Sequence, residues 1–196
     1  MKNLRVSGRA ESMPPFLVVD VIDRAAELRR QGKDVIMLAV GEPDLDTPAC
    51  VVEAANRALA RRCTHYTPSL GIIELREAIC EDYLRRYGVT VHPDQIIVTP
   101  GTSPAMFLVF PGLIEPGEEI ILSDPGYACY GNMIEYVGGV AATVPVFEED
   151  GFQYRPEMIR ERLTPRTRAI LINSPSNPTG NLLSPERMKE IAGYVR

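Results

Sequence analysis

Four short loops hold the residues whose types and spacing could carry chemistry. They are AVGEPD at residues 39–44, TPGTSPA at 99–105, SDPGYACY at 123–130 and NSPSNPTG at 173–180. Each loop comes at the end of a short apolar run that favours a strand. In α/β proteins, ligands bind beyond the carboxyl ends of the strands, so we expect a site among these loops.

The loop at 99–105 could bind an anion. Gly101 permits an unusual backbone angle, and Thr102 and Ser103 open the helix pattern that follows. The free amides and the dipole at a helix N-terminus attract anions, and the two hydroxyls add donors. Small polar residues also cap helices that bind nothing, so this loop by itself favours a simple helix start over a phosphate site.

The other three loops could position a ring, an amide and a stretch of main chain. Tyr127 follows a Pro–Gly pair, where it could offer an aromatic face or pack over a helix start. Asn177 precedes a proline, which restricts its backbone; its amide could donate to a phenolate, or the segment could be a tight turn. Gly41 could let a ligand approach the main chain, or form a plain turn. Together the loops suit a flat, phosphorylated heteroaromatic cofactor.

The elements that must position these loops alternate along the chain. A helix is also expected to start with Thr47 as its N-cap, and another to run from Ser184 to Arg196 without a clear stop. Strand patterns cover 35–40, 95–99, 118–123, 141–147 and 168–173, and helix patterns cover 16–31, 71–87, 103–113, 127–138 and 156–164. Short strands alternating with helices predict an α/β layered fold with a mainly parallel sheet.

Composition narrows the class of protein. The chain has 196 residues, 45% hydrophobic and 24% charged, which suffices for a domain with a real core. The net charge of −5 with no basic run argues against nucleic-acid binding. The longest apolar run, 105–110, is too short to span a membrane, and the N-terminus has no secretion-signal pattern. Four cysteines without a CxxC pair, and two histidines without metal-like spacing, predict free thiols in the cytoplasm and no metal site.

The loop sequences resemble those of the class I/II aminotransferases of fold type I, which use pyridoxal 5′-phosphate (PLP). The matching motifs, in the order and at the separations usual in that family, are LAVGEPDLDTP (38–48), YTPSLGIIELREAI (66–79), VTPGTSPAMF (98–107), DPGYACY (124–130) and NSPSNPTG (173–180). The resemblance implies an incomplete fold type I large domain, a mainly parallel sheet with flanking helices, over residues 46–196. Residues 1–45 would form an N-terminal arm and a segment of the small domain.

The resemblance also implies roles for the loop residues. Thr102 and Ser103 would bind the PLP phosphate through their backbone amides, and Ser103 also through its hydroxyl. Tyr127 would stack on the pyridine ring, and Asn177 would hydrogen-bond the phenolic oxygen of that ring. Gly41 and Asn177 would contact the substrate, with the main chain of Gly41 against the carboxylate.

Two further features come with the resemblance. Tyr66 would reach the PLP phosphate of a neighbouring subunit, which implies a homodimer with shared sites. The proline bonds that follow Asp124 and Asn177 are often cis in relatives.

The chain departs from the family pattern in its lysines. The Schiff-base lysine of the family follows a later strand, downstream of the NPTG motif, as do the aspartate beneath the pyridine nitrogen and the arginines that grip substrate carboxylates. The lysines here are Lys2, Lys33 and Lys189, and none follows a strand pattern. We therefore expect the N-terminal half of an aminotransferase, with no catalytic lysine and no activity by itself.

Three functions remain open at this point. The first is transfer of an amino group between an amino acid and a 2-oxo acid. The second is another fold type I PLP reaction, of the β-lyase or cyclopropane-forming synthase type, because those enzymes share the motifs. The third is a non-catalytic remnant that serves as a binding module. The sequence does not identify the amino donor.

Overall fold

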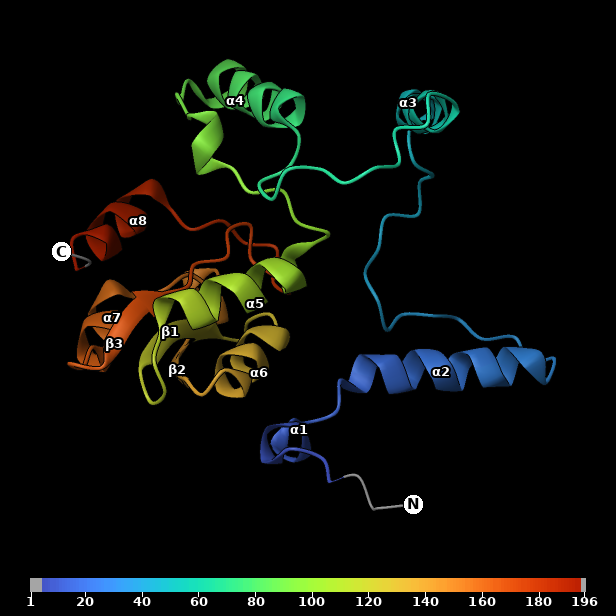
Figure 1. Cartoon of the computed structure of the whole chain (residues 1–196). Coiled ribbons are helices and arrows are strands. Elements are labelled where there is room, and N and C mark those ends of the chain that lie inside the picture. The colour runs from blue at the N-terminus through green and yellow to red at the C-terminus, as the bar shows by residue number, and fades with distance from the viewer. Residues whose placement is uncertain (1–4, 195–196) are drawn as a thin grey trace. The chain divides into compact units, whose positions relative to one another are not determined.

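The structure is a computed structural model that describes residues 5–194. The chain divides into two compact units, the first built from residues 1–16 and 103–196 and the second from residues 17–102. Figure 1 labels the elements of both units. The predicted division at residues 45 and 46 stays a prediction, and Lys2 lies outside the described residues.

The first unit is organised around three parallel strands. They are β1 (Glu119–Asp124), β2 (Val140–Pro145) and β3 (Thr167–Ile170), in the spatial order β2-β1-β3. Ile121 of β1 is in register with Ala142 on one side and with Ile170 on the other. The predicted α/β fold with a mainly parallel sheet is confirmed.

Helices cover both faces of this sheet. They are α5 (Thr102–Leu113), α6 (Cys129–Tyr136), α7 (Pro156–Arg162) and α8 (Pro185–Ala192). Ile120 and Leu122 of β1 pack in one buried cluster with side chains of α5 and α6. Ile121 points to the other face and packs in a second cluster with Ile159 of α7 and Ile191 of α8. Since strand side chains alternate between faces, β1 is buried on both sides, which is typical of parallel sheets.

The burial of these side chains is the main source of stability in this unit. Ile121, Ile134 and Ile159 are 0% exposed, and each fully buried isoleucine contributes about 1.5–3 kcal/mol. Two short helices complete the unit, α1 (Gly8–Ser12) and the 3₁₀ turn η2 (Glu148–Asp150).

The second unit is mostly helical. It contains α2 (Leu17–Arg30), α3 (Ala49–Ala60), α4 (Ile73–Tyr87) and the 3₁₀ turn η1 (Pro93–Gln95). Gly88 ends α4 with φ of 65°, the left-handed conformation that glycine adopts without strain. No helix in residues 5–194 is long and apolar enough to cross a membrane.

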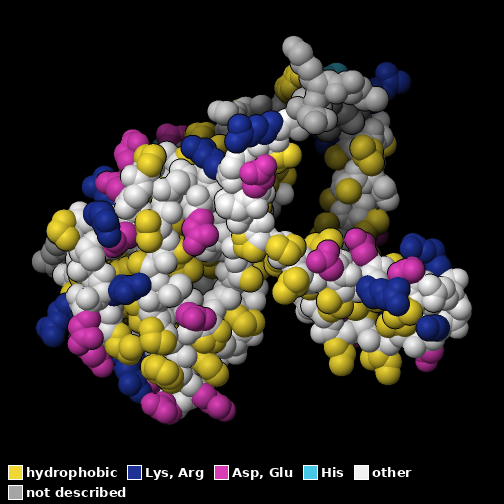
Figure 2. Space-filling view, turned by 90° about the horizontal axis from the view of Figure 1, so that it is seen from below, with side chains coloured by type: hydrophobic (Ala, Val, Ile, Leu, Met, Phe, Trp, Pro, Cys, Tyr) yellow, Lys and Arg dark blue, Asp and Glu magenta, His cyan; other side chains and the backbone are white. Residues whose placement is uncertain are grey.

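Few side chains of the second unit are buried. Ala25 and Arg76 are the buried residues between 17 and 102, whereas Ile36 is 83% and Leu38 is 91% exposed. Figure 2 shows hydrophobic side chains at several places on the face of the molecule that it draws. The buried Arg76 side chain links two backbone segments, because it donates hydrogen bonds to the carbonyl oxygens of Gly71 at 3.2 Å and Pro93 at 3.0 Å.

Three details of the sequence prediction were wrong. Residues 35–40 and 95–99 are not strands, because neither segment has a partner strand among the described residues and a strand needs one to satisfy its amides. The N-cap of α3 is Pro48 rather than Thr47, with no side-chain cap. Helix α8 ends at Ala192, with Gly193 as its C-cap, rather than running on to Arg196.

Candidate functional site

Tyr127 is placed by a tight turn at the end of β1. The Asp124–Pro125 peptide is cis, as the family resemblance implied. Gly126 follows it so closely over the strand that an added Cβ would lie 2.5 Å from the carbonyl oxygen of Ser123. Glycine is therefore required there, and it delivers Tyr127 to the beginning of α6.

The Tyr127 side chain is half-buried and constrained by aromatic contact. Its ring meets that of Tyr130 edge to face, with centroids 5.1 Å apart and planes at 74°. The pKa of Tyr127 is raised by a side-chain hydrogen bond with Cys129 and, secondly, by burial. The phenol stays neutral at physiological pH, so this residue offers an uncharged aromatic surface.

Asn177 lies in the loop that follows β3. Pairing with β1 extends one residue beyond the strand, because the Leu171 amide donates to the carbonyl oxygen of Ile121 at 2.8 Å. The peptide bonds Ser174–Pro175 and Asn177–Pro178 are both cis; the second was implied by the resemblance and the first was not. The side chain of Asn177 is exposed.

The same loop is closed on itself by backbone bonds. The Gly180 amide donates to the carbonyl oxygen of Ser176 at 2.7 Å, and the Ser176 amide donates to that of Asn181 at 2.9 Å. The Leu183 amide donates to the Ser174 hydroxyl at 3.0 Å. These bonds hold residues 174–183 in a compact turn. The hydroxyl oxygen of Thr179 is buried with no hydrogen-bond partner among the described residues.

The N-terminus of α5 is open for an anion. Gly101 adopts φ of +116°, and its carbonyl oxygen accepts a 2.8 Å bond from the Thr99 hydroxyl. The first-turn amides of Thr102 and Ser103 have no partner within a helix, and the first turn carries no acidic side chain. Ser103 is half-buried and Thr102 is exposed.

Topology brings three of the predicted site residues to one edge of the sheet. Tyr127 and Asn177 follow β1 and β3, which are neighbouring parallel strands, so their loops leave the sheet at the same end. Helix α5 leads by a short turn into β1 and packs on it through Met106 and Phe110, so it runs back along the strand. Its first turn, which contains Ser103, therefore lies toward the carboxyl ends of the strands.

The remaining predicted residues belong to the second unit, with Thr102 as its last residue. Gly41 is exposed, and a Cβ added there would meet nothing within 4 Å. Tyr66 is fully exposed. Their roles toward substrate and a neighbouring subunit stay predictions.

Sequence reasoning missed a polar network behind the loop of Asn177. Arg187 of α8 donates to the carbonyl oxygens of Gln153 at 3.3 Å and Tyr154 at 3.2 Å, and to Asp150 at 3.2 Å. Gln153 in turn accepts from the Ser184 amide at 2.7 Å. These partners are more than thirty positions apart in the sequence, so no local pattern could have indicated them.

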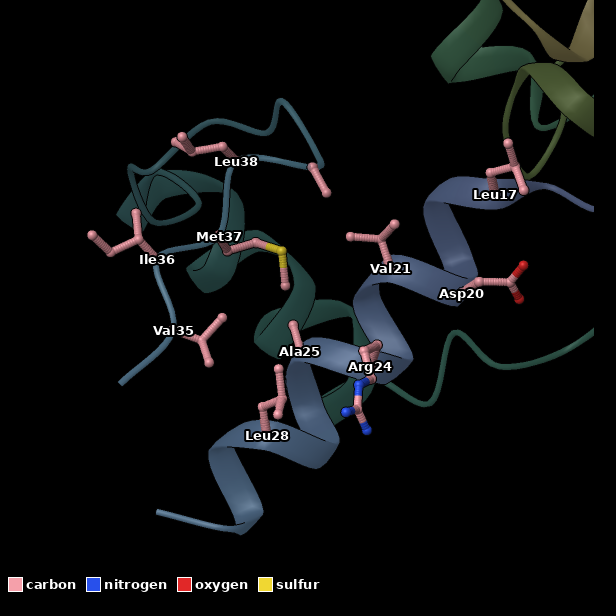
Figure 3. A pocket seen from close by; sticks show the side chains of 11 residues that line it. Leu17, Asp20, Val21, Arg24, Ala25, Leu28, Val35, Ile36, Met37 and Leu38 are labelled. Atoms are coloured by element: carbon pink, nitrogen blue, oxygen red, sulfur yellow. The ribbon is translucent and has the colours of Figure 1, made fainter. Parts of the chain in front are cut away.

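An apolar cavity lies elsewhere in the described residues. It has a volume of about 660 Å³ and lies between α2 and the segment at 35–39 (Figure 3). Val21, Ala25 and Leu28 of the helix face Val35 and Met37 across it. None of the predicted site residues lines this apolar cavity. The described residues also contain no group of metal-binding side chains.

Comparisons with known proteins identify the family. The family model for aminotransferases of class I and II matches residues 33–196. The probable aspartate/prephenate aminotransferase of Thermus aquaticus is 45% identical over 95% of this chain, and the aspartate/prephenate aminotransferase of Thermus thermophilus is 44% identical over 95%. In each case the match covers 49% of the relative. The chain thus spans about half the length of the curated relatives it matches.

Solved structures agree with this result. Aspartate aminotransferase from Thermus thermophilus with maleate superposes with a TM-score of 0.92 at 44% identity, over 97% of this chain and 50% of that one. The sheet and helices that the two structures share confirm the fold type I assignment made from the motifs. Sequence and structure together show that the chain belongs to the class I and II aminotransferases, whose cofactor is PLP.

Proposed function

We propose that the protein is an aminotransferase that moves an amino group between an amino acid and a 2-oxo acid. The observation that carries the proposal is the arrival of Ser103, Tyr127 and Asn177 at one edge of a parallel sheet, on separate elements. Each of the three supplies a different kind of contact: a hydroxyl with free amides, an aromatic face, and a primary amide. A general structural role would not require this combination at a single edge.

The residues present fit PLP. The first-turn amides of Thr102 and Ser103 have no hydrogen-bond partner among the described residues, and that turn of α5 carries no acidic side chain, so it is suited to the dianionic phosphate. The half-buried ring of Tyr127 matches the flat pyridine, and the exposed Asn177 amide can donate to the phenolic oxygen. When bound, PLP supplies an electron sink for the negative charge that develops on the amino acid α-carbon.

The chain's own residues would bind and orient the cofactor. Thr102 and Ser103 would hold the phosphate, Asn177 would fix the phenolic edge of the ring, and Tyr127 would shield one ring face from water. Lys33 follows α2 and Lys189 lies on α8, and both are exposed. Neither follows a strand at the site edge, so we assign no proton-moving role to them and expect no transfer activity from these 196 residues alone.

Substrates and assembly follow from the relatives as proposals. The most suitable first pair is aspartate as amino donor and prephenate as acceptor, because similar relatives carry those names. Gly41 would meet the substrate carboxylate. Tyr66, fully exposed here, would serve the site of a second subunit in a homodimer. The four free cysteines favour the cytoplasm.

A binding experiment tests the proposal. The chain is titrated with PLP by equilibrium dialysis, beside the variant Asn177→Ala and the control Asn56→Ala, an exposed asparagine of α3. We expect saturable binding that Asn177→Ala weakens about tenfold, the effect of one charge-assisted hydrogen bond, and that Asn56→Ala leaves unchanged.

Covalent attachment is a separate measurement. After borohydride reduction, mass spectrometry should find no PLP fixed to a lysine; a stoichiometric lysine adduct would contradict our assignment. A chain that binds no PLP saturably would overturn the proposed function and favour a non-catalytic remnant.

A further inference from the structure

The side chain of Asn173, the first residue of NSPSNPTG, is hydrogen-bonded to the backbone of Asn177. One end of its side-chain amide lies 2.9 Å from the Asn177 amide nitrogen, and the other end lies 3.2 Å from the carbonyl oxygen of Pro175. The partners determine how the amide is oriented, since an N–H must face an acceptor and a carbonyl must face a donor. Thus Oδ1 of Asn173 accepts from the Asn177 N–H, and Nδ2 donates to Pro175.

Asn173 is better anchored than the residue it contacts. It is half-buried and follows Ile172, which packs against the cluster that contains Ile121 and Ile159. Asn177 is exposed, and its side chain makes no hydrogen bond within the described residues. The bond from Asn173 therefore links an exposed residue to the core of the first unit.

The hydrogen bond from the Asn177 N–H to Asn173 restrains the backbone from which the Asn177 side chain extends. The Asn177 N–H is bonded to the Cα from which the side chain extends. The bond to that N–H holds the Ser176–Asn177 peptide unit, and the bond to the carbonyl of Pro175 holds the Pro175–Ser176 peptide unit before it. The loop closure through Ser176 and Asn181 acts on the backbone flanking it and leaves this N–H to Asn173.

We propose that Asn173 is a positioning residue that aims the Asn177 amide at the phenolic oxygen of PLP. The proposal rests on the proposed function for its ligand, but the link between the two asparagines is a property of the protein alone. Asn173 acts only through Asn177 and does not itself touch the cofactor. The effects of the two residues on PLP affinity should therefore be coupled, and Asn173 should make no contribution to that affinity apart from Asn177.

A double-mutant cycle on PLP affinity tests this coupling. The variants are Asn173→Ala, Asn177→Ala and the double variant, each titrated with PLP as the full chain. We expect Asn173→Ala to raise the Kd about tenfold, and the double variant to be no weaker than Asn177→Ala alone. Additive losses would overturn the proposal, because they would show that Asn173 acts independently of Asn177.

A matched control removes an asparagine from the same loop. Asn181 uses its backbone carbonyl in the loop, and its side chain makes no hydrogen bond within residues 5–194. Asn181→Ala should therefore keep the Kd for PLP within about twofold of the wild type. A loss as large as that of Asn173→Ala would show general loosening of the loop and would contradict a specific role.

Amide hydrogen exchange measures the link without the cofactor. In the wild type we expect the Asn177 N–H to be protected, and in Asn173→Ala to exchange at least about tenfold faster. Asn173→Asp keeps an oxygen acceptor facing the N–H, so protection should persist in that variant, which also serves if Asn173→Ala fails to fold. Unchanged exchange in Asn173→Ala, or lost protection in a folded Asn173→Asp, would overturn the link. A wild type that binds no PLP would refute the proposed function, and the exchange data would still decide the link.

Discussion

The phenolic hydroxyl of Tyr154 donates a hydrogen bond of 3.0 Å to the carbonyl oxygen of Leu171. Leu171 is held on its other side by the bond from its amide to Ile121 in β1. Leu171, two residues before NSPSNPTG, is thus fixed both to the sheet and to the segment before α7. The core of the first unit therefore determines where the loop at residues 173–180 begins.

Replacing Tyr154 by phenylalanine should lower the free energy of unfolding by about 1 kcal/mol. The ring keeps its packing, and the variant loses the hydrogen bond that the buried hydroxyl donates to Leu171. Urea denaturation of Tyr154→Phe measures it. The control is Tyr194→Phe, whose hydroxyl donates to Glu190 at the surface, and which should change stability by less than about 0.5 kcal/mol. Equal effects of the two variants would contradict the assignment.

The same tyrosine makes stability depend on alkaline pH. Burial is the largest cause that raises the pKa of Tyr154 to about 12 from 10.0. The unfolded chain ionises first, so the contribution of neutral Tyr154 is complete below pH 10 and is lost as the pH rises toward 12. Denaturation series at pH 9 to 12 should show a steeper decline for the wild type than for Tyr154→Phe. Parallel declines would show that another group is responsible.

Glu119 should make the fold sensitive to acid. Its buried carboxylate accepts hydrogen bonds from Thr164 at 2.7 Å, Arg166 at 2.8 Å and Thr167 at 3.2 Å. The bond from Thr164, followed by those from Arg166 and Thr167, lowers the pKa of Glu119 below 4.5, although burial opposes this shift. The stabilisation is present above pH 4.5 and disappears as the pH falls through the lowered pKa.

The variant Glu119→Gln isolates that contribution. At pH 7 the free energy of unfolding of the variant should be about 1–3 kcal/mol lower than that of the wild type. The carboxylate only accepts hydrogen bonds, whereas the amide that replaces it must also donate. Most of the loss should come from the hydroxyl bonds, because the Arg166 side chain is 69% exposed and its ion pair is screened. Glu161→Gln, at an exposed position of α7, serves as the control. A loss that stays the same at pH 3 would contradict the role of the charge.

A side chain at Gly71 should destabilise the protein. Its φ is +97°, and an added Cβ would lie 2.7 Å from a methyl carbon of Val98. Gly71→Ala is expected to cost about 1–3 kcal/mol and to speed exchange of the Val98 amide, which donates to Leu70 at 3.0 Å. Gly112→Ala in α5 meets nothing within 4 Å and should be neutral or stabilising by up to about 1 kcal/mol. Similar losses in both variants would argue against strain at Gly71.

The hydroxyl of Ser103 should contribute to phosphate binding beside the backbone amides of α5. Ser103→Ala keeps the α5 amides, so we expect the Kd for PLP to rise only about three- to tenfold. Inorganic phosphate should compete with PLP in the wild type and compete less well in the variant. Ser12→Ala in α1 is the matched control and should leave both values unchanged. Competition that Ser103→Ala does not alter would place the phosphate elsewhere.

Short-range patterns were enough to predict the strand–loop–helix order of the first unit. The runs at 118–123, 141–147 and 168–173 became β1, β2 and β3, because their β-rich apolar stretches find each other as neighbours in a parallel sheet. The same reasoning failed at 35–40 and 95–99, which have equally apolar sequences. A strand exists only when another strand accepts its hydrogen bonds, and no local sequence property supplies that partner.

The sequence by itself determined the family, the loops and the residue types that could hold PLP, because glycines, prolines and capping residues act within a few positions of one another. The tertiary structure decided which of these residues meet. It brought Ser103, Tyr127 and Asn177 to one sheet edge, and it buried Glu119 against Thr164, 45 residues away. It also placed the side-chain amide of Asn173 where it hydrogen-bonds the Asn177 N–H and the Pro175 carbonyl oxygen. Such contacts depend on chain packing and backbone direction, and those are settled only when the whole unit folds.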